Sequence, residues 1–261
     1  MRVCHYNILD GGVGRADPLA EVIAAQNPDV VTLVEAEDTD VLRRLAYRLK
    51  MDFVQGMGPK RASAVLTRHL LLDSVNHALV TPGAPRSCLE ATVRIDGFAW
   101  RLAAVHFLPH ASDEAETKRQ AEANVLLGLF AEARAANRPH LLAGDFNANH
   151  PQQQVDVQQA HPRTRRDVEA NGGELPRRVV PQFLAAGYTD LHHQGAGDAA
   201  LSAEAGATFT TAHPQQRVDY VFGYAAKATH AYVEHHRLAT YASDHYPVIV
   251  DVEPAGERRS G

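Results

Sequence analysis

The chain has few of the features that would send a protein out of the cell or into a membrane. It has only two cysteines, Cys4 and Cys88, and their apolar neighbours favour buried free thiols over a disulfide. No apolar run is long enough to span a bilayer, and the N-terminus enters a predicted strand without the basic and apolar stretches of a signal peptide. We therefore expect a soluble cytoplasmic protein with no membrane span.

The chain also lacks an excess of positive charge, since 31 Asp and Glu residues stand against 26 Lys and Arg residues. This balance gives no general attraction to polyphosphate, so any affinity for nucleic acid must come from a local patch or a bound cation. No linker, repeat or low-complexity run divides the 261 residues, which can bury a sizeable core. We expect one monomeric domain over residues 1–254 and a disordered tail at 255–261.

Short apolar runs that end in polar residues predict buried strands. The clearest is Leu-Leu-Ala at 141–143, which leads through a glycine into Asp145-Phe146-Asn147. Because alternate residues of an extended chain face the same way, Asp145 and Asn147 should project together while Phe146 turns into the core. An ordinary turn explains these few residues equally well.

The rest of the chain alternates predicted strands and helices. We expect strands at 2–9, 30–34, 62–67, 88–94, 100–106, 217–222 and 247–252, with a hairpin turn at 96–97. Helices are expected at 18–26 with Asp17 as N-cap, at 39–50, at 113–136 with Ser112 as N-cap, and at 181–186. Residues 150–180, with five arginines, are expected to form a long loop beside the site, although solvated surface arginines are the simpler explanation of the charges.

Polar groups that can bind cations or activate water stand at many of the predicted strand ends. They are Asn7, Glu35, His106, Asp145, Asn147, Asp219, Asp244 and His245. Carboxylates meeting in one cleft would repel by about 4 kcal/mol per pair at 4 Å and an effective dielectric near 20. A hard dication removes that penalty, and oxygen ligands favour Mg²⁺ or Mn²⁺ over structural zinc. Such an ion, with a histidine to handle a water proton, makes a site for in-line attack on a phosphorus ester. Taken singly, Glu35 is better explained by solvation and His106 by ordinary hydrogen bonding.

The order of these motifs resembles that of the endonuclease/exonuclease/phosphatase (deoxyribonuclease-like) superfamily. The matching segments are Tyr6-Asn7-Ile8, Glu35 after Val-Thr-Leu-Val, His106-Phe107, Gly144-Asp-Phe-Asn147, Arg217-Val-Asp-Tyr220 and Ser243-Asp-His245. The resemblance implies a four-layer α/β sandwich, in which two mixed β-sheets pack face to face with helices outside. It also implies a metal-dependent phosphoric ester hydrolase.

The resemblance further implies residue roles in metal and phosphate binding. Glu35, with Asn7 close by, would hold the main Mg²⁺ or Mn²⁺. Asp244 would complete the surroundings of that ion or form a second metal site. Asp145 and Asn147 would orient the attacking water and the phosphate.

The two histidines of the motif set are implied to act on phosphate oxygens. His106 would donate to a nonbridging oxygen. His245 would contact or protonate a phosphate oxygen or act as the base, with Asp219 fixing its tautomer. Arg86 is a candidate substrate-facing cation, although an ordinary surface arginine is an equal explanation.

We therefore expect a phosphodiesterase, and first of all a nuclease, that acts on a phosphate ester by in-line water attack. The alternatives are a phosphomonoesterase or a sphingomyelinase-like lipid phosphodiesterase. A non-catalytic binding module on the same fold fits less well, because every expected catalytic position holds a competent residue.

Overall fold

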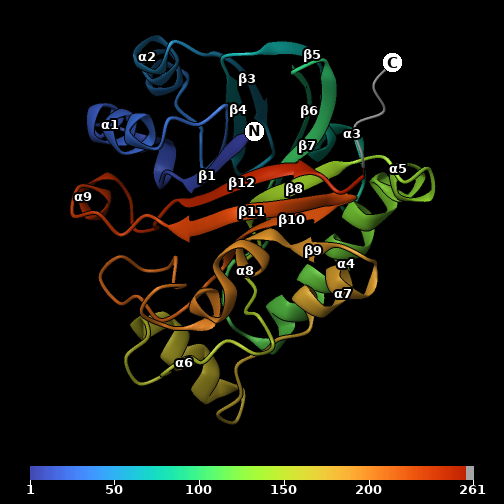
Figure 1. Ribbon diagram of the computed structural model, residues 1–261. Coiled ribbons are helices and arrows are strands. Elements are labelled where there is room, and N and C mark those ends of the chain that lie inside the picture. The colour runs from blue at the N-terminus through green and yellow to red at the C-terminus, as the bar shows by residue number, and fades with distance from the viewer. Residues whose placement is uncertain (257–261) are drawn as a thin grey trace.

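Two six-stranded sheets pack face to face in the computed structural model, which describes residues 1–256 (Figure 1). The first sheet has the order β11 (Ala226–Val233), β12 (Val248–Pro254), β1 (Arg2–Asn7), β2 (Val30–Val34), β4 (Ala62–Thr67) and β3 (Asp52–Met57). The second has the order β5 (Leu70–Asn76), β6 (Ser87–Ile95), β7 (Phe98–His106), β8 (His140–Asp145), β10 (Asp219–Tyr224) and β9 (Thr189–Asp190). Both sheets are mixed, because β1 and β2 are parallel, as are β7 and β8, while the other pairs are antiparallel.

Helices cover the outer faces of the sheets, which completes the four layers that the sequence predicted (Figure 1). On the first sheet lie α1 (Ala16–Gln26), α2 (Thr39–Leu49) and α9 (Ala239–Ala242). On the second lie α4 (Asp113–Leu129), α5 (Ala131–Ala135) and α7 (Val179–Ala185). The shorter α3 (His77–Val80), α6 (Pro162–Ala170) and α8 (Leu191–Ala196), with the 3-10 turns Asp10–Gly12 and Gly197–Leu201, lie in the connections.

Two apolar clusters hold these layers together. The larger joins the facing sides of the sheets to α1 and α2, through residues such as Leu33, Leu102 and Leu141. The smaller lies between the second sheet and its helices, and Phe146 is fully buried in it, as predicted. Both cysteines are buried and free, also as predicted.

Several expected element boundaries are wrong. Asp17 does not cap α1, which begins at Ala16; its carboxylate instead pairs with Arg44 and Arg48 of α2, which draws it to the helix surface. The helix expected over 113–136 ends at Leu129, where Phe130 leaves helical geometry, and α5 follows. The edge strands β3, β5, β9 and β11 were not predicted. For β5 the reason is that the strand is mostly exposed and lacks a buried face.

Residues 150–180 are not one long loop, because 162–170 form α6. Asp167 of this helix accepts a hydrogen bond from Ala111 N at 2.9 Å, which ties α6 to the segment after β7. The expected tail at 255–261 lies outside the described residues from 257 onward. Among the helices of residues 1–256, none is long and apolar enough to cross a membrane.

A buried acid also stabilises the second sheet away from the strand ends. Glu90 of β6 binds Arg101 of β7 at 2.8 Å and His77 of α3 at 3.0 Å. Burial alone would raise the pKa of the Glu90 carboxyl, but these two partners lower it to about 2.

Candidate active site

Strand register brings the predicted site residues to one edge of the sandwich. In the first sheet β1 and β2 are parallel with Asn7 opposite Val34, so Asn7 and Glu35 emerge side by side. In the second sheet the parallel pair β7 and β8 sets His106 opposite Asp145, and the antiparallel β10 sets Asp219 opposite Asp145. The close approach of β7 and β8 needs Gly144, because a Cβ there would lie 2.1 Å from Val105 O.

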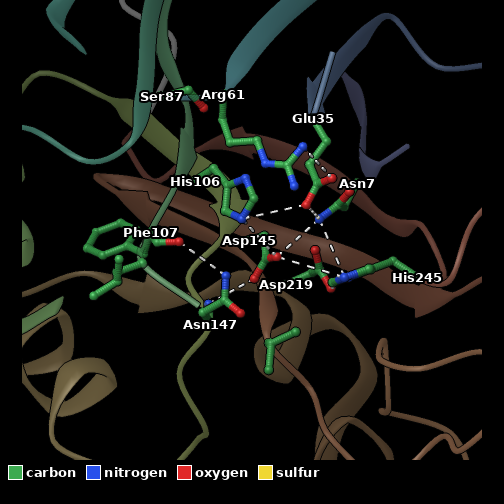
Figure 2. A network of polar contacts seen from close by, with 12 residues as sticks. Asn7, Glu35, Arg61, Ser87, His106, Phe107, Asp145, Asn147, Asp219 and His245 are labelled. Carbon is green, nitrogen blue, oxygen red and sulfur yellow. Dashed lines mark hydrogen bonds and ion pairs between the residues drawn. The ribbon is translucent and has the colours of Figure 1, made fainter. Parts of the chain in front are cut away.

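The side chains from the two sheets converge on the Asp145 carboxylate (Figure 2). Asn7 Nδ2 donates to Asp145 Oδ2 at 3.1 Å, and the same amide nitrogen lies 3.5 Å from Glu35 Oε1. The Nε2 atoms of His106 and His245 lie 3.5 and 3.8 Å from Asp145 Oδ2. One carboxylate oxygen therefore faces an amide and two imidazoles, all of them nearly excluded from solvent.

A second buried carboxylate, Asp219, holds His245 in place. Its Oδ2 lies 2.8 Å from His245 Nδ1, and its Oδ1 lies 3.2 Å from Nε2 of His5. Burial by itself would lower the pKa of the His245 imidazole, but Asp219 and then Asp145 raise it to about 10. His245 is therefore protonated at neutral pH, with Nδ1 directed at Asp219 and Nε2 directed into the site.

The environment shifts the other ionisable groups of the site in opposite directions. Burial, reinforced by the nearby Asp219 charge, raises the pKa of the Asp145 carboxyl. Burial would do the same to Asp219, but the charge and hydrogen bond of His245 lower its pKa instead. Burial, with the charge of Arg86, lowers the pKa of His106, which is therefore neutral.

Asn147 reaches the site by a route that strand alternation did not predict. The strand β8 ends at Asp145, and Asn147 has a φ of 47°, outside extended geometry. Its backbone N–H donates to Asp145 Oδ1 at 2.8 Å, and its Nδ2 donates to Phe107 O at 3.2 Å. The side chain is thereby fixed beside the carboxylate by a local turn rather than by the pleat of the strand.

The donor set fits a hard cation. Ligand atoms of Asp145, Asp219 and His245 lie within 4.8 Å of one another. Since Asp219 is already bound to the imidazole, the Glu35 carboxylate is the better hard donor. Asn7 directs Nδ2 at the carboxylates of Glu35 and Asp145, while its Oδ1 accepts from Leu9 N at 3.0 Å.

Two predicted residues lie outside this network. The Asp244 side chain makes no hydrogen bond to the other site residues within 1–256, and its buried Oδ1 has no partner there; its backbone oxygen accepts from Thr211 N at 2.8 Å. Arg86 is half-buried, and its charge helps to lower the pKa of His106.

Three residues that shape the site were given no role by sequence reasoning. His5 lies two positions before Asn7 on β1, so strand alternation could have placed both side chains on one face. Arg61 lies 3.3 Å from Glu35 Oε2, a contact for which the sequence gives no signal. Ser243 donates from Oγ to Asn7 O at 2.7 Å and accepts from His245 N at 3.2 Å, which couples the β1 end to the His245 loop.

Comparisons with known proteins identify the family of the chain and its fold. The family model described as "Endonuclease/Exonuclease/phosphatase family" matches residues 4–245. A search of curated proteins finds no match to the chain.

Solved structures share the fold at low sequence identity. A protein titled endonuclease/exonuclease/phosphatase from Beutenbergia cavernae DSM 12333 is similar at 23% identity and a TM-score of 0.71, over 98% of this chain and 72% of that one. A 3'-5' exonuclease (NExo) from Neisseria meningitidis is similar at 21% identity and a TM-score of 0.71, over 96% and 99%. Humanized D. rerio TDP2 is similar at 21% identity and a TM-score of 0.67, over 97% and 98%.

Proposed function

The chain belongs to the Endonuclease/Exonuclease/phosphatase family, and from that premise we propose that it is a divalent-metal-dependent phosphodiesterase acting by in-line attack of water. The observation that supports this most is the arrangement around Asp145 Oδ2. Asn7 Nδ2, His106 Nε2 and His245 Nε2 lie 3.1, 3.5 and 3.8 Å from that single oxygen. One space is thus faced by a neutral imidazole, a cationic imidazole and a basic carboxylate. These are the acid and base groups that phosphoryl transfer to water requires.

Glu35, with Asn7 close by, would hold the ion, Mg²⁺ or Mn²⁺, and Asp145 would remain free to act as the base. When bound, it neutralises negative charge on the phosphate and on the ligand carboxylates. The remaining chemistry belongs to the side chains around it.

Asp145, whose pKa is raised by burial, takes a proton from the attacking water. The water oxygen forms a bond to phosphorus while the bond from phosphorus to the leaving oxygen breaks. Asn147 positions the water beside Asp145, since its amide is fixed by Phe107 O. The cationic His245 and the neutral His106 donate hydrogen bonds to nonbridging oxygens, where negative charge develops in the transition state.

The basic test is hydrolysis of bis(p-nitrophenyl) phosphate with Mg²⁺ or Mn²⁺. We expect EDTA to abolish turnover and His245→Gln to lower kcat by about 10²-fold or more, because a general acid–base or charge-stabilising group is worth this much. His230→Gln, at an exposed position on β11, is the matched control. Undiminished turnover in His245→Gln would contradict the mechanism.

Within this activity a nuclease is our first choice. Arg163, Arg165 and Arg166 are exposed on α6, and Arg163 lines a cavity of about 50 Å³ together with Asn147 and Phe209. The likeness to a 3'-5' exonuclease agrees with this choice.

These arginines supply the local positive patch that the net charge of the chain lacks. Binding to DNA should therefore weaken steeply with salt, and neutralising the three arginines should flatten that slope. A salt-insensitive enzyme that cleaves a lipid or small phosphate but not DNA would reject the nuclease assignment.

A further inference from the structure

Two arginines at the rim of the site come from opposite sheets and are not used by the mechanism above. Arg61 directly precedes β4, where Ala36 N donates to Ala62 O at 3.1 Å, so this segment lies against the one that carries Glu35. Arg86 directly precedes β6, where Ser87 is paired with His106 of β7. Strand register therefore sets each arginine beside a residue of the site.

The two segments that carry these arginines also lie against each other. A Cβ built on Gly58 would lie 2.3 Å from Arg86 O and 2.7 Å from Arg61 O, so only a glycine fits between them. Just beyond the arginines, the hydroxyls of Ser63 and Ser87 are 2.6 Å apart. The positions of Arg61 and Arg86 are thus fixed relative to each other.

The two arginines differ in how their charges are paired. Arg61 lies 2.8 Å from Asp10, 3.3 Å from Glu35 and 3.7 Å from Glu37. Arg86 has no such ion pair in residues 1–256, and its Nε is buried without a hydrogen-bond partner there, as is the Nε of Arg61. Burial and the charge of Arg61 together lower the pKa of Arg86.

An unpaired, half-buried guanidinium such as that of Arg86 is costly unless an anion binds it, and Arg binds phosphate in bidentate fashion. Arg61 contacts Glu35, and no ion pair joins it to Asp145 within residues 1–256 (Figure 2). The scissile phosphate, held near Asp145, would therefore leave these arginines free for another group.

We propose that Arg61 and Arg86 form a subsite for a second, non-scissile phosphate of the substrate. The subsite rests on the proposed function, and it narrows the substrate to esters that carry another phosphate close to the one that is cleaved. A nucleotide chain and an inositol polyphosphate both have that chemistry, whereas sphingomyelin does not.

The test measures binding rather than turnover. Thymidine 3',5'-bisphosphate and thymidine 5'-monophosphate are titrated calorimetrically into the protein with Ca²⁺ present, and inositol 1,4-bisphosphate and inositol 1-phosphate form the second arm. We expect the wild-type protein to bind at least one bisphosphate about tenfold tighter than its monophosphate, as one bidentate charged contact allows. The ratio of bisphosphate to monophosphate affinity is compared between the nucleotide arm and the inositol arm. The arm with the larger ratio identifies the source of the second phosphate.

Arg86→Gln should bring that ratio of affinities close to one. Arg86→Lys should restore only part of it, because lysine keeps the charge but cannot make the bidentate contact of a guanidinium. Arg138→Gln, at an exposed arginine paired with Glu132, is the control and should keep the full ratio. Thermal unfolding of each variant establishes that it is folded.

An unchanged ratio in Arg86→Gln, or a wild-type ratio near one in both arms, would overturn the subsite. Ester hydrolysis with a ratio near one would leave the proposed function standing without the subsite. The expected ratios in a protein that cleaves no ester would support the subsite and reject the proposed function.

Discussion

Replacing Asp219 by Asn tests whether this carboxylate acts through His245. Asp219 is fully buried, and its two oxygens contact His245 Nδ1 at 2.8 Å and His5 Nε2 at 3.2 Å. The amide keeps the size of the side chain but loses the charge, and it can present a donor where His245 needs an acceptor. The imidazole should then lose both its fixed orientation and its proton.

The size of the effect follows from the 2.8 Å contact. Opposite unit charges at that distance attract by about 6 kcal/mol at an effective dielectric near 20. Desolvation offsets part of this, so that breaking such a buried pair costs about 3–5 kcal/mol. If that loss falls on the transition state, kcat should drop by about 10²- to 10⁴-fold.

The assay is a double-mutant cycle of kcat on bis(p-nitrophenyl) phosphate. Asp219→Asn should cost little in a His245→Gln background, because the group through which it acts is already gone. Additive losses in the double variant would refute the reasoning, since they would mean that Asp219 acts independently of His245. Unfolding curves separate this outcome from a general loss of structure.

Three further predictions use other contacts of the structure. Glu35→Gln should abolish most of the rise in Tm that Mn²⁺ gives the wild-type protein, because a ligand stabilises only the state that binds it; an equal rise in both proteins would exclude Glu35 as a ligand. Ser243→Ala should cost about 1–3 kcal/mol of unfolding free energy in denaturant titrations, because it leaves the backbone groups of Asn7 and His245 without their buried partner. It should also lower kcat more than it raises KM, whereas a purely structural serine would leave kcat unchanged. Glu90, whose folded-state pKa is depressed to about 2, stabilises the fold above its unfolded pKa near 4.5 and loses that contribution as pH falls toward 2. Glu90→Gln should therefore cost roughly 1–2 kcal/mol at pH 7 after allowance for solvent screening, and less at pH 3; a constant difference in unfolding free energy would contradict this.

The sequence was sufficient to predict the parts of the fold in which apolar patterning dominates. The strands around Val31, Leu102 and Leu142 are buried runs, and their periodicity is the direct consequence of that burial. The edge strand β5 escaped prediction because its stability depends on pairing with β6, which no local pattern records. The N-cap of α1 was wrongly predicted for a similar reason, since long-range pairing with Arg44 and Arg48 takes up the Asp17 carboxylate.

The residues of the site likewise divide into those that the sequence could identify and those that it could not. Asn7, Glu35 and Asp145 could be identified because they directly end apolar runs, and such positions meet at one edge of a sheet. The contribution of Arg61 to the site could not be predicted from the sequence. It depends on how close two segments of different sheets lie at Gly58. Local geometry also determines how the Asn147 side chain is placed. Its backbone has a positive φ, so the residue does not follow the strand alternation that the sequence implied.

The site depends on the packing of one sheet against the other, and β1 is the strand whose side chains connect the two sheets there. Alternate residues of β1 face opposite ways: Tyr6 donates to Ala239 O of α9 on the outer face, while His5 and Asn7 reach buried carboxylates of the second sheet. A slip of β1 by one residue would exchange these faces, burying the outer residues between the sheets and removing His5 from Asp219 and Asn7 from Asp145. Because losing a buried hydrogen bond to a charged group costs about 1–3 kcal/mol, these two polar contacts select the same register that the apolar residues select. The polar groups of the site therefore help to specify the sandwich that assembles them, and a substitution that loosens β1 should reduce stability and catalysis together.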